Sequence, residues 1–394
     1  MKGCRVAKTR GVAPGARRLS RRAFVRGSLG ALALLLPLPW RPKPAACQEI
    51  QQGFSRPYRA SFQKVMPSRM VQCLICPRNC EVKDGERGEC GVRENRKGIY
   101  YSLVYGNPCA VHVDPVEKKP FFHVLPGSRS FSIATAGCNL HCKFCQNWEI
   151  SQATPEKTDN FDLPPEKVVA EAKAAGCLSV AYTYVEPIIF YEYMTAVGRL
   201  TKGAGLLSTC HSAGYINAEP LEELAQVLDA ATIDLKAFDP HFYKELVDGK
   251  LEPVLNTLKT LRRRGVHLEV VNLVIPQFND QPQNISDMCA WIRDELGPLT
   301  PLHFSRFYPL YKMQNHFPTP VSTLESAREL ALKAGLKYVY LGNIPGHQAE
   351  NTHCHGCGKL LIARRGYQVG EMHLQEGACE YCGVKIPGIW KQKA

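Results

Sequence analysis

Between residues 130 and 345 the chain alternates short apolar runs, rich in β-branched residues, with longer segments in which apolar residues recur every three or four positions. This alternation predicts strands and amphipathic helices in turn. The predicted strands are Phe131–Thr135, Ser179–Tyr184, Gly205–Cys210, Thr232–Leu235, Leu268–Ile275, His303–Phe307 and Tyr338–Leu341.

Two of the intervening helices have boundaries that can be read from the sequence. Residues 251–264 place their apolar side chains on one face and stop at Gly265. Residues 323–334 follow a capping box formed by Ser322 and Glu325. Because strands and helices joined by short connections form parallel sheets, seven such units predict an α/β fold with a full or partial barrel.

Ligands in such a barrel bind at the C-terminal ends of the strands. Polar residues follow each of the first four predicted strands, so the sequence predicts a site where these strands end. They are Gly137-Cys138, Glu186-Pro187, His211-Ser212-Ala213-Gly214 and Lys236.

The composition, with 45% hydrophobic and 22% charged residues in a chain of 394, is typical of a globular protein. A net charge of +13 favours nucleic-acid binding if it is spread over the fold. However, residues 1–46 contain eleven Lys and Arg residues and no acid, which leaves 38 basic and 36 acidic residues in the rest of the chain. The body therefore carries only +2, and we expect no nucleic-acid partner.

The basic segment 1–46 resembles a twin-arginine export signal. Arg21-Arg22 precedes an apolar run from Ser28 to Trp40, and this run is too short and too interrupted by proline to span a bilayer. We therefore expect no transmembrane span and a periplasmic or membrane-associated protein. The alternatives are a disordered basic leader, or a cytoplasmic protein whose translation starts at Met66 or Met70.

Eleven of the 17 cysteines form three closely spaced sets. The sets are Cys73, Cys76, Cys80 and Cys90; Cys138, Cys142 and Cys145; and Cys354, Cys357, Cys379 and Cys382. Such short spacings favour metal binding over disulfides. Metal binding requires reduced thiolates, which conflicts with an exported protein unless it crosses the membrane already folded around its cofactors.

The three sets divide the chain. We predict a linker over residues 47–72 and an N-terminal Cys-rich module over 73–125. A barrel over 126–345 and a C-terminal zinc-ribbon-like module over 346–394 follow.

The central set has the spacing C-x-x-x-C-x-x-C in a loop that leaves a predicted strand. Three thiolates can each bind one iron of a four-iron four-sulfur cluster, which leaves the fourth iron open to a substrate or cofactor. The spacing alone also fits a three-thiolate zinc site or a ferredoxin-like knuckle whose fourth cysteine lies elsewhere.

With Phe144 before its last cysteine, this motif resembles that of radical S-adenosylmethionine (SAM) enzymes. The wider sequence resembles the radical SAM member of the AmmeMemoRadiSam group, whose barrel is similar to that of pyruvate formate-lyase activating enzymes. The resemblance covers about residues 70–390. It rests on Cys76-Pro77-Arg78-Asn79-Cys80, Gly88-Glu89-Cys90-Gly91-Val92-Arg93, Asp114-Pro115-Val116-Glu117-Lys118-Lys119-Pro120, Cys145-Gln146-Asn147, Tyr182-Thr183-Tyr184-Val185-Glu186-Pro187, Asp234-Leu235-Lys236, Ile275-Pro276 with Asn279-Asp280, and Gly342-Asn343.

The resemblance implies a partial barrel of the radical SAM type. Cys138, Cys142 and Cys145 would hold a 4Fe-4S cluster whose open iron binds SAM. Reduction of the cluster, by a protein such as ferredoxin or flavodoxin, would cleave SAM, and the resulting deoxyadenosyl radical would abstract a hydrogen atom from an unidentified protein or small-molecule substrate.

The resemblance also implies contacts with SAM. Phe144 would lie near the adenine, Glu186 would meet the ammonium group, and Ser212 would lie near the ribose or carboxylate. Asp234 and Lys236 would lie near SAM at the end of a strand. A purely structural salt bridge at the rim of the barrel is an equally simple explanation of this pair. The sequence departs from the family pattern where Tyr184-Val185 replaces two glycines before Glu186, and where Ala213 replaces a frequent asparagine.

The two outer cysteine sets predict structural metal sites. The C-terminal spacing C-x-x-C, twenty-one residues, C-x-x-C is typical of a zinc ribbon, with an auxiliary iron–sulfur cluster as the alternative. The four N-terminal cysteines suit either Zn²⁺ or a fully ligated iron–sulfur cluster, and the sequence alone slightly favours Zn²⁺.

The sequence as a whole therefore predicts a radical SAM enzyme. One alternative is an activating enzyme for a glycyl-radical protein. The other is a non-catalytic zinc-ribbon adaptor built on a barrel.

Overall fold

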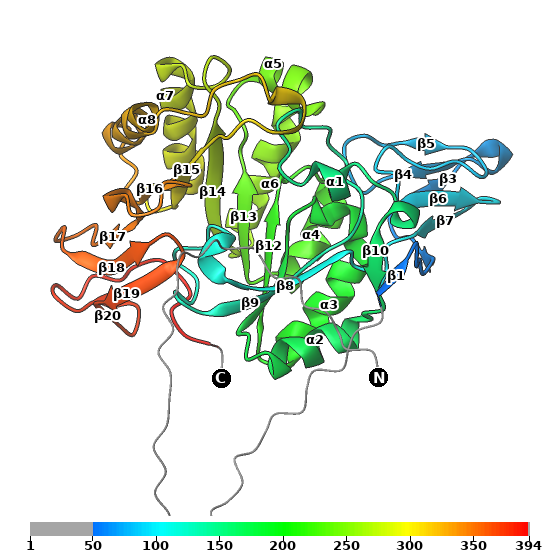
Figure 1. Ribbon diagram of the computed structural model, residues 1–394, viewed down its shortest axis with the longest axis horizontal. Helices are drawn as coiled ribbons and strands as arrows, with labels where there is room; N and C mark the ends of the chain where they lie inside the picture. The colour runs from blue at the N-terminus through cyan, green and yellow to red at the C-terminus, as the bar shows by residue number, and fades with distance from the viewer. Residues whose placement is uncertain (1–49, 393–394) are drawn as a thin grey trace, which may run out of the picture. The chain divides into compact units, whose positions relative to one another are not determined.

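A mostly parallel sheet forms where the apolar runs predict strands (Figure 1). The computed structural model describes residues 50–392, so the leader predicted over 1–46 lies outside the described residues. The strand order is β16-β15-β14-β13-β12-β11-β9-β8, with β8 antiparallel to β9 and the other neighbours parallel. Its strands are β8 (Ala110–Pro115), β9 (Arg129–Ala134), β11 (Ser179–Tyr182), β12 (Leu207–Ser212), β13 (Ala230–Asp234), β14 (His267–Val274), β15 (Leu302–Arg306) and β16 (Val339–Gly342).

The sheet has two edges, β8 and β16, so the prediction of a partial barrel is confirmed. Among the described residues, six helices of ten or more residues, namely α2, α3, α4, α6, α7 and α8, alternate with the parallel strands. Helices α2, α3, α6 and α8 each contact strands next to them in sequence (Figure 1). The strands are buried over most of their length, as expected when helices cover a parallel sheet. The helices are α1 (Trp148–Ser151), α2 (Pro165–Ala174), α3 (Tyr191–Gly203), α4 (Ala218–Val227), α5 (Pro240–Phe242), α6 (Leu251–Arg263), α7 (Pro282–Trp291) and α8 (Val321–Lys333).

The two helices with predicted boundaries are present. Helix α6 buries Leu251, Val254, Leu258 and Leu261 and ends before Gly265, as predicted. Helix α8 begins earlier than predicted, which makes the capping-box prediction wrong. Its N-cap is Pro320 and no side chain caps it, because Ser322 already lies inside the first turn.

The N-terminal region is folded where the sequence predicts a linker. Strand β1 pairs with β10, β2 joins a sheet with β6 and β7, and β3 joins one with β4 and β5, so residues 50–72 are part of the folded body. These strands are β1 (Ile50–Gln52), β2 (Tyr58–Arg59), β3 (Gln63–Val65), β4 (Val71–Cys73), β5 (Glu81–Val82), β6 (Arg93–Arg96), β7 (Ile99–Ser102) and β10 (Asp159–Phe161).

The C-terminal region consists of five short antiparallel strands in two small sheets (Figure 1). Its apolar core includes Tyr338 and Tyr340 from the end of the barrel, and the backbone of Ile389 pairs with that of His123 and Leu125. The strands are β17 (Thr352–His353), β18 (Leu360–Arg365), β19 (Gln368–Met372), β20 (Leu374–Gln375) and β21 (Ala378–Cys379). Among the described helices, none is both long and apolar enough to cross a bilayer.

Candidate active site

The ends of β9, β11, β12 and β13 surround a cavity of about 420 Å³. Its volume falls in the range of about 300–1,000 Å³ that is usual for small-molecule sites. The structure brings all eight residues predicted for the central site to its wall. They are Cys138, Cys142, Phe144, Cys145, Glu186, Ser212, Asp234 and Lys236.

The three central cysteines lie in a loop between β9 and α1. The loop opens at Gly137, whose φ of +94° is a conformation that glycine adopts without strain. The amide of Leu140 donates to the sulfur of Cys138 over 3.4 Å, and the sulfur of Cys145 lies 3.3 Å from the Ser151 hydroxyl. The loop therefore presents thiols that already contact polar groups.

The spacing of these sulfurs distinguishes between the metal sites that the motif allows. Among the described residues, the C-terminal cysteines form the one set of three or more potential ligands whose ligand atoms all lie within 4.8 Å of one another. The central sulfurs are therefore too far apart to share a single ion as they stand. A polynuclear cluster, in which each thiolate binds a different iron, fits them better than Zn²⁺.

Glu186 joins the ends of two neighbouring strands. It follows β11, and its carboxylate accepts hydrogen bonds from the Ser212 hydroxyl at 2.6 Å and the Ala213 amide at 2.7 Å at the end of β12. Burial raises the pKa of Glu186, and the Ser212 hydrogen bond opposes this shift. The carboxylate is therefore held in one orientation at the cavity wall.

Asp234 and Lys236 form the ion pair that the sequence offered as an alternative, and both also line the cavity. The Asp234 carboxylate accepts from Lys236 Nζ at 3.0 Å and from His211 Nε2 at 2.9 Å. Burial alone would raise the pKa of Asp234, but the charges of Lys236 and His211 hold it below its usual range. Lys236 Nζ also lies 5.7 Å from the ring centroid of Phe144, so the pair packs directly beside the cysteine loop.

Tyr184, which stands where the family pattern has a glycine, has a backbone conformation that favours glycine. Its φ is +67°, a left-handed conformation that is strained for a tyrosine. Asn147 donates to the Tyr184 carbonyl at 2.6 Å, and the Tyr184 hydroxyl donates to Asp114, which also pairs with Lys119. The tyrosine ring thus occupies space at the cavity wall that a glycine leaves open.

Sequence reasoning did not assign roles to His211, Asn147 or Tyr184. Each carried a signal, since His211 lies in the polar run that follows the predicted strand Gly205–Cys210, and the other two lie in stretches that match the family. Their partners are distant in sequence, so the contacts themselves become visible only in the structure.

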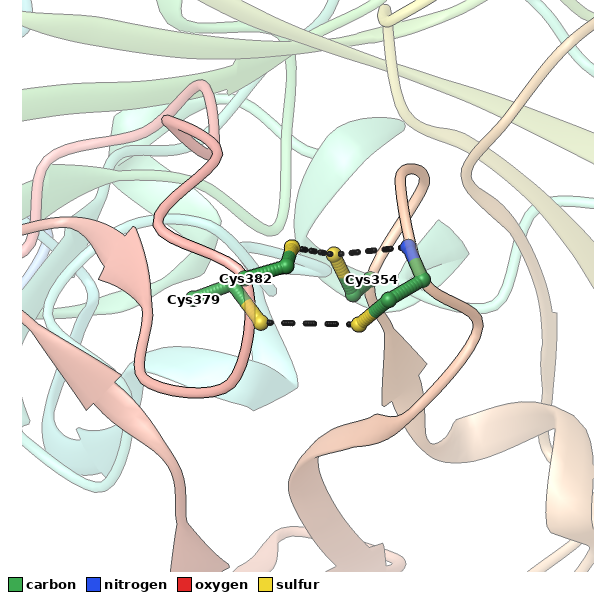
Figure 2. Close-up of side chains that lie close together, drawn as sticks. Cys354, Cys379 and Cys382 are labelled. Carbon is green, nitrogen blue, oxygen red and sulfur yellow. Dashed lines mark hydrogen bonds between the residues drawn. The ribbon is translucent and has the colours of Figure 1, made fainter.

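The C-terminal cysteines converge on one point from two loops (Figure 2). The sulfurs of Cys354 and Cys382 lie 3.6 Å apart, and those of Cys357 and Cys379 lie 3.7 Å apart. These distances are far longer than a disulfide bond of about 2.05 Å. They match the edge of about 3.8 Å that follows from a tetrahedron of sulfurs with Zn–S bonds of about 2.3 Å. A metal ion fits this site.

The N-terminal cysteines have a different arrangement. Cys73, Cys76, Cys80 and Cys90 all line a second, largely enclosed cavity, and no three of their sulfurs lie mutually within 4.8 Å. Every cysteine among the described residues is a free thiol.

Comparison with known proteins identifies the class. Residues 132–289, which contain the cysteine loop and the strand ends around the cavity, match the model of the radical SAM superfamily. The chain is 43% identical over 329 residues to the uncharacterized protein MJ0808 of Methanocaldococcus jannaschii, covering 83% of this chain and 98% of that protein. The chain therefore belongs to the family of MJ0808, and its central part is a radical SAM domain.

Two further proteins are more distantly similar to this chain. Pyruvate formate-lyase-activating enzyme of Listeria monocytogenes is 26% identical over 43% of this chain and 71% of its own length. A radical SAM methyltransferase from Sphaerobacter thermophilus matches 60% of this chain and 71% of its own with a TM-score of 0.44 and 15% identity. Radical SAM domains imply a 4Fe-4S cluster and SAM, and the residues at the central cavity fit both.

Proposed function

We propose that this protein cleaves SAM reductively at the central cavity and abstracts a hydrogen atom from a protein or small-molecule substrate. The observation that carries the proposal is the convergence of three cysteines and five further predicted residues on one cavity at the C-terminal ends of the parallel strands. A non-catalytic adaptor would not need such a cavity beside its metal ligands.

The bound cluster and SAM supply the radical chemistry. The chain positions them. Cys138, Cys142 and Cys145 would hold the cluster, and Phe144 offers an apolar ring beside Lys236. The fixed carboxylate of Glu186 would meet a cationic group of the ligand through a charge-assisted interaction.

Three finer assignments belong to the same proposal. The stretches between Cys76 and Asn343 that resemble the AmmeMemoRadiSam group support membership of that group. A low-potential one-electron donor such as ferredoxin or flavodoxin would reduce the cluster. The C-terminal four cysteines would bind Zn²⁺, as their sulfur distances support.

Activation of a glycyl-radical protein is the second candidate function. The 26% identity to a pyruvate formate-lyase-activating enzyme supports it. In that case the abstracted hydrogen would come from a backbone glycine of a partner protein, and incubation with that partner would generate a glycyl radical detectable by electron paramagnetic resonance (EPR).

The test of SAM cleavage is anaerobic reconstitution with iron and sulfide, followed by dithionite and SAM. We expect wild type and Cys109→Ala to release deoxyadenosine, since Cys109 lies outside the three cysteine sets. Cys142→Ala should release none. Equal product from wild type and Cys142→Ala, or none from wild type carrying a reducible cluster, would contradict the proposal.

A further inference from the structure

The four N-terminal cysteines surround a small space of about 20 Å³ rather than a point, so the thiols would move outward to admit a group larger than a water molecule or two. Cys73 and Cys76 are buried, Cys80 and Cys90 are half-buried, and all four line one largely enclosed cavity. A single Zn²⁺ would require four sulfurs within about 3.8 Å of one another. No three of these sulfurs lie mutually within even 4.8 Å, whereas the C-terminal set meets this requirement.

Two buried polar atoms at the same cavity have no hydrogen-bond partner among the described residues. Arg93 is 1% exposed and Tyr100 is 0% exposed, and both line the cavity. These atoms are the Arg93 Nη1 atom and the Tyr100 hydroxyl, whereas the other guanidinium nitrogens of Arg93 donate to Glu192 and to the Ile189 carbonyl. Unpaired buried donors are costly, so these two point to an acceptor inside the cavity.

The backbone keeps the cavity open on the side of Tyr100. A Cβ atom on Gly88 would lie 2.8 Å from the Tyr100 hydroxyl and 3.6 Å from the sulfur of Cys80. Any larger residue at position 88 would therefore displace the hydroxyl from its place beside the thiols.

From these observations we propose that Cys73, Cys76, Cys80 and Cys90 ligate a second iron–sulfur cluster, of the four-iron four-sulfur type. In such a cluster each thiolate binds a different iron, so the iron–sulfur core holds the four thiolate sulfurs apart. This agrees with four sulfurs that lie around a cavity and do not converge on one point. The cluster sulfur atoms would accept hydrogen bonds from Arg93 Nη1 and the Tyr100 hydroxyl. This assignment replaces the zinc that we favoured from sequence alone.

The cavity lies directly against the loop of the central site. Asn139 lines it, and Arg78 donates to the Asn139 carbonyl at 2.6 Å. On the other side, a Cβ on Gly137 would lie 2.6 Å from the carbonyl oxygen of Cys90. The second cluster would therefore lie beside the residues that flank Cys138.

The test uses the full chain and a variant without the central ligands, Cys138→Ala/Cys142→Ala/Cys145→Ala. After anaerobic reconstitution we expect this variant to retain about four irons and about four sulfides per chain. On reduction with dithionite it should show an EPR signal that added SAM leaves unchanged. The complementary variant Cys76→Ala/Cys80→Ala should lose this signal and keep the SAM-sensitive one.

Wild type provides a measurement that does not depend on either variant folding. Mössbauer spectra of wild type loaded with enriched iron should contain two cluster components, and SAM should perturb only one of them. Iron for a single cluster in wild type, together with about two zinc ions per chain, would overturn the proposal. Because the triple variant cannot bind the central cluster, its iron content is independent of whether SAM is cleaved.

Discussion

The two outer cysteine sets each contain four thiols, yet their surroundings differ. In the C-terminal set the sulfurs meet at 3.6 and 3.7 Å, and Cys357 and Cys382 are exposed. The N-terminal sulfurs stay apart around a largely enclosed cavity whose wall holds the unpaired donors of Arg93 and Tyr100. The number of cysteines therefore indicates only that a metal binds. The kind of metal centre is indicated by two other features, namely the sulfur–sulfur distances and the polar groups that surround the sulfurs.

Local backbone geometry explains the C-terminal arrangement. Each cysteine pair is followed by a glycine, Gly358 or Gly383, with a φ of +74°. These turns direct the amides of Gly356 and Cys357 toward the sulfur of Cys354. Two such turns facing each other bring the four sulfurs to one point.

The largest difference between the sets should appear when the C-terminal ligands are removed. The double variant Cys354→Ala/Cys379→Ala should lose about one zinc ion per chain, because both sulfur pairs lose a member. Structural zinc supplies about 10–16 kcal/mol of apparent binding energy in isolated fingers, so residues 346–392 should unfold locally. Metal analysis and limited proteolysis measure the two effects.

Iron content and Cys109→Ala serve as the controls for this variant. Iron should stay at the wild-type level in both, and Cys109→Ala should keep its zinc. Retained zinc in the double variant would show that the ion binds elsewhere, and lost iron would show that the C-terminal set takes part in cluster binding.

A smaller effect should come from the buried charge that supports the N-terminal cavity. Arg93 and Glu192 pair at 2.5 Å with side chains only 2% and 3% exposed. Arg93→Met leaves Glu192 buried without its partner, which should cost about 3–5 kcal/mol. Anaerobic urea unfolding measures this loss.

Arg96→Met is the matched control on the same strand. The Arg96 side chain is 46% exposed, so its ion pair with Glu94 should contribute about 1 kcal/mol or less to stability. Equal losses in the two variants would contradict the structural difference between them.

The sequence predicted those features that depend on neighbouring residues. All seven parallel strands lie where apolar runs predicted them, and α6 begins and ends as its periodicity indicates, because these patterns are local. The capping box failed because Ser322-x-x-Glu325 is a short motif, and the chain begins the helix at Pro320 instead. The segment before Cys73 looked like a linker because strands of two or three residues show no periodicity.

The candidate sites show the same limit. Polar residues after predicted strands placed Glu186, Ser212 and Lys236 at one cavity, because parallel strands end at the same side of a sheet. The partner of Arg93 is Glu192, ninety-nine residues later, so no spacing rule links them. The difference between a zinc site and a cavity for a cluster is likewise a three-dimensional property.

The exposure of the two sites predicts different responses to a chelator. Ethylenediaminetetraacetate can reach the C-terminal ion past Cys357 and Cys382, which are exposed, whereas the N-terminal cavity must open first. An opening cost of only about 1.4 kcal/mol makes iron loss about tenfold slower than zinc loss. Anaerobic time courses of zinc and iron release from the Cys138→Ala/Cys142→Ala/Cys145→Ala variant measure this ratio. Equal rates would mean that the N-terminal site is as open as the C-terminal one.

The smallest effect should come from removing a single hydroxyl. Tyr100→Phe removes a donor that has no partner within residues 50–392, so stability should change by no more than about 1 kcal/mol and iron content should stay the same. Hydrogen bonds to cluster sulfurs stabilise the more negatively charged reduced state, so their loss should make the reduction potential of the N-terminal cluster more negative. A redox titration followed by EPR measures this shift.

Tyr101→Phe on the same strand is the control, since Tyr101 does not line the cavity and its variant should keep the wild-type potential. An unchanged potential in Tyr100→Phe would show that the hydroxyl does not reach the cluster, and would leave the four thiolates and Arg93 as the groups that distinguish this site from its C-terminal counterpart.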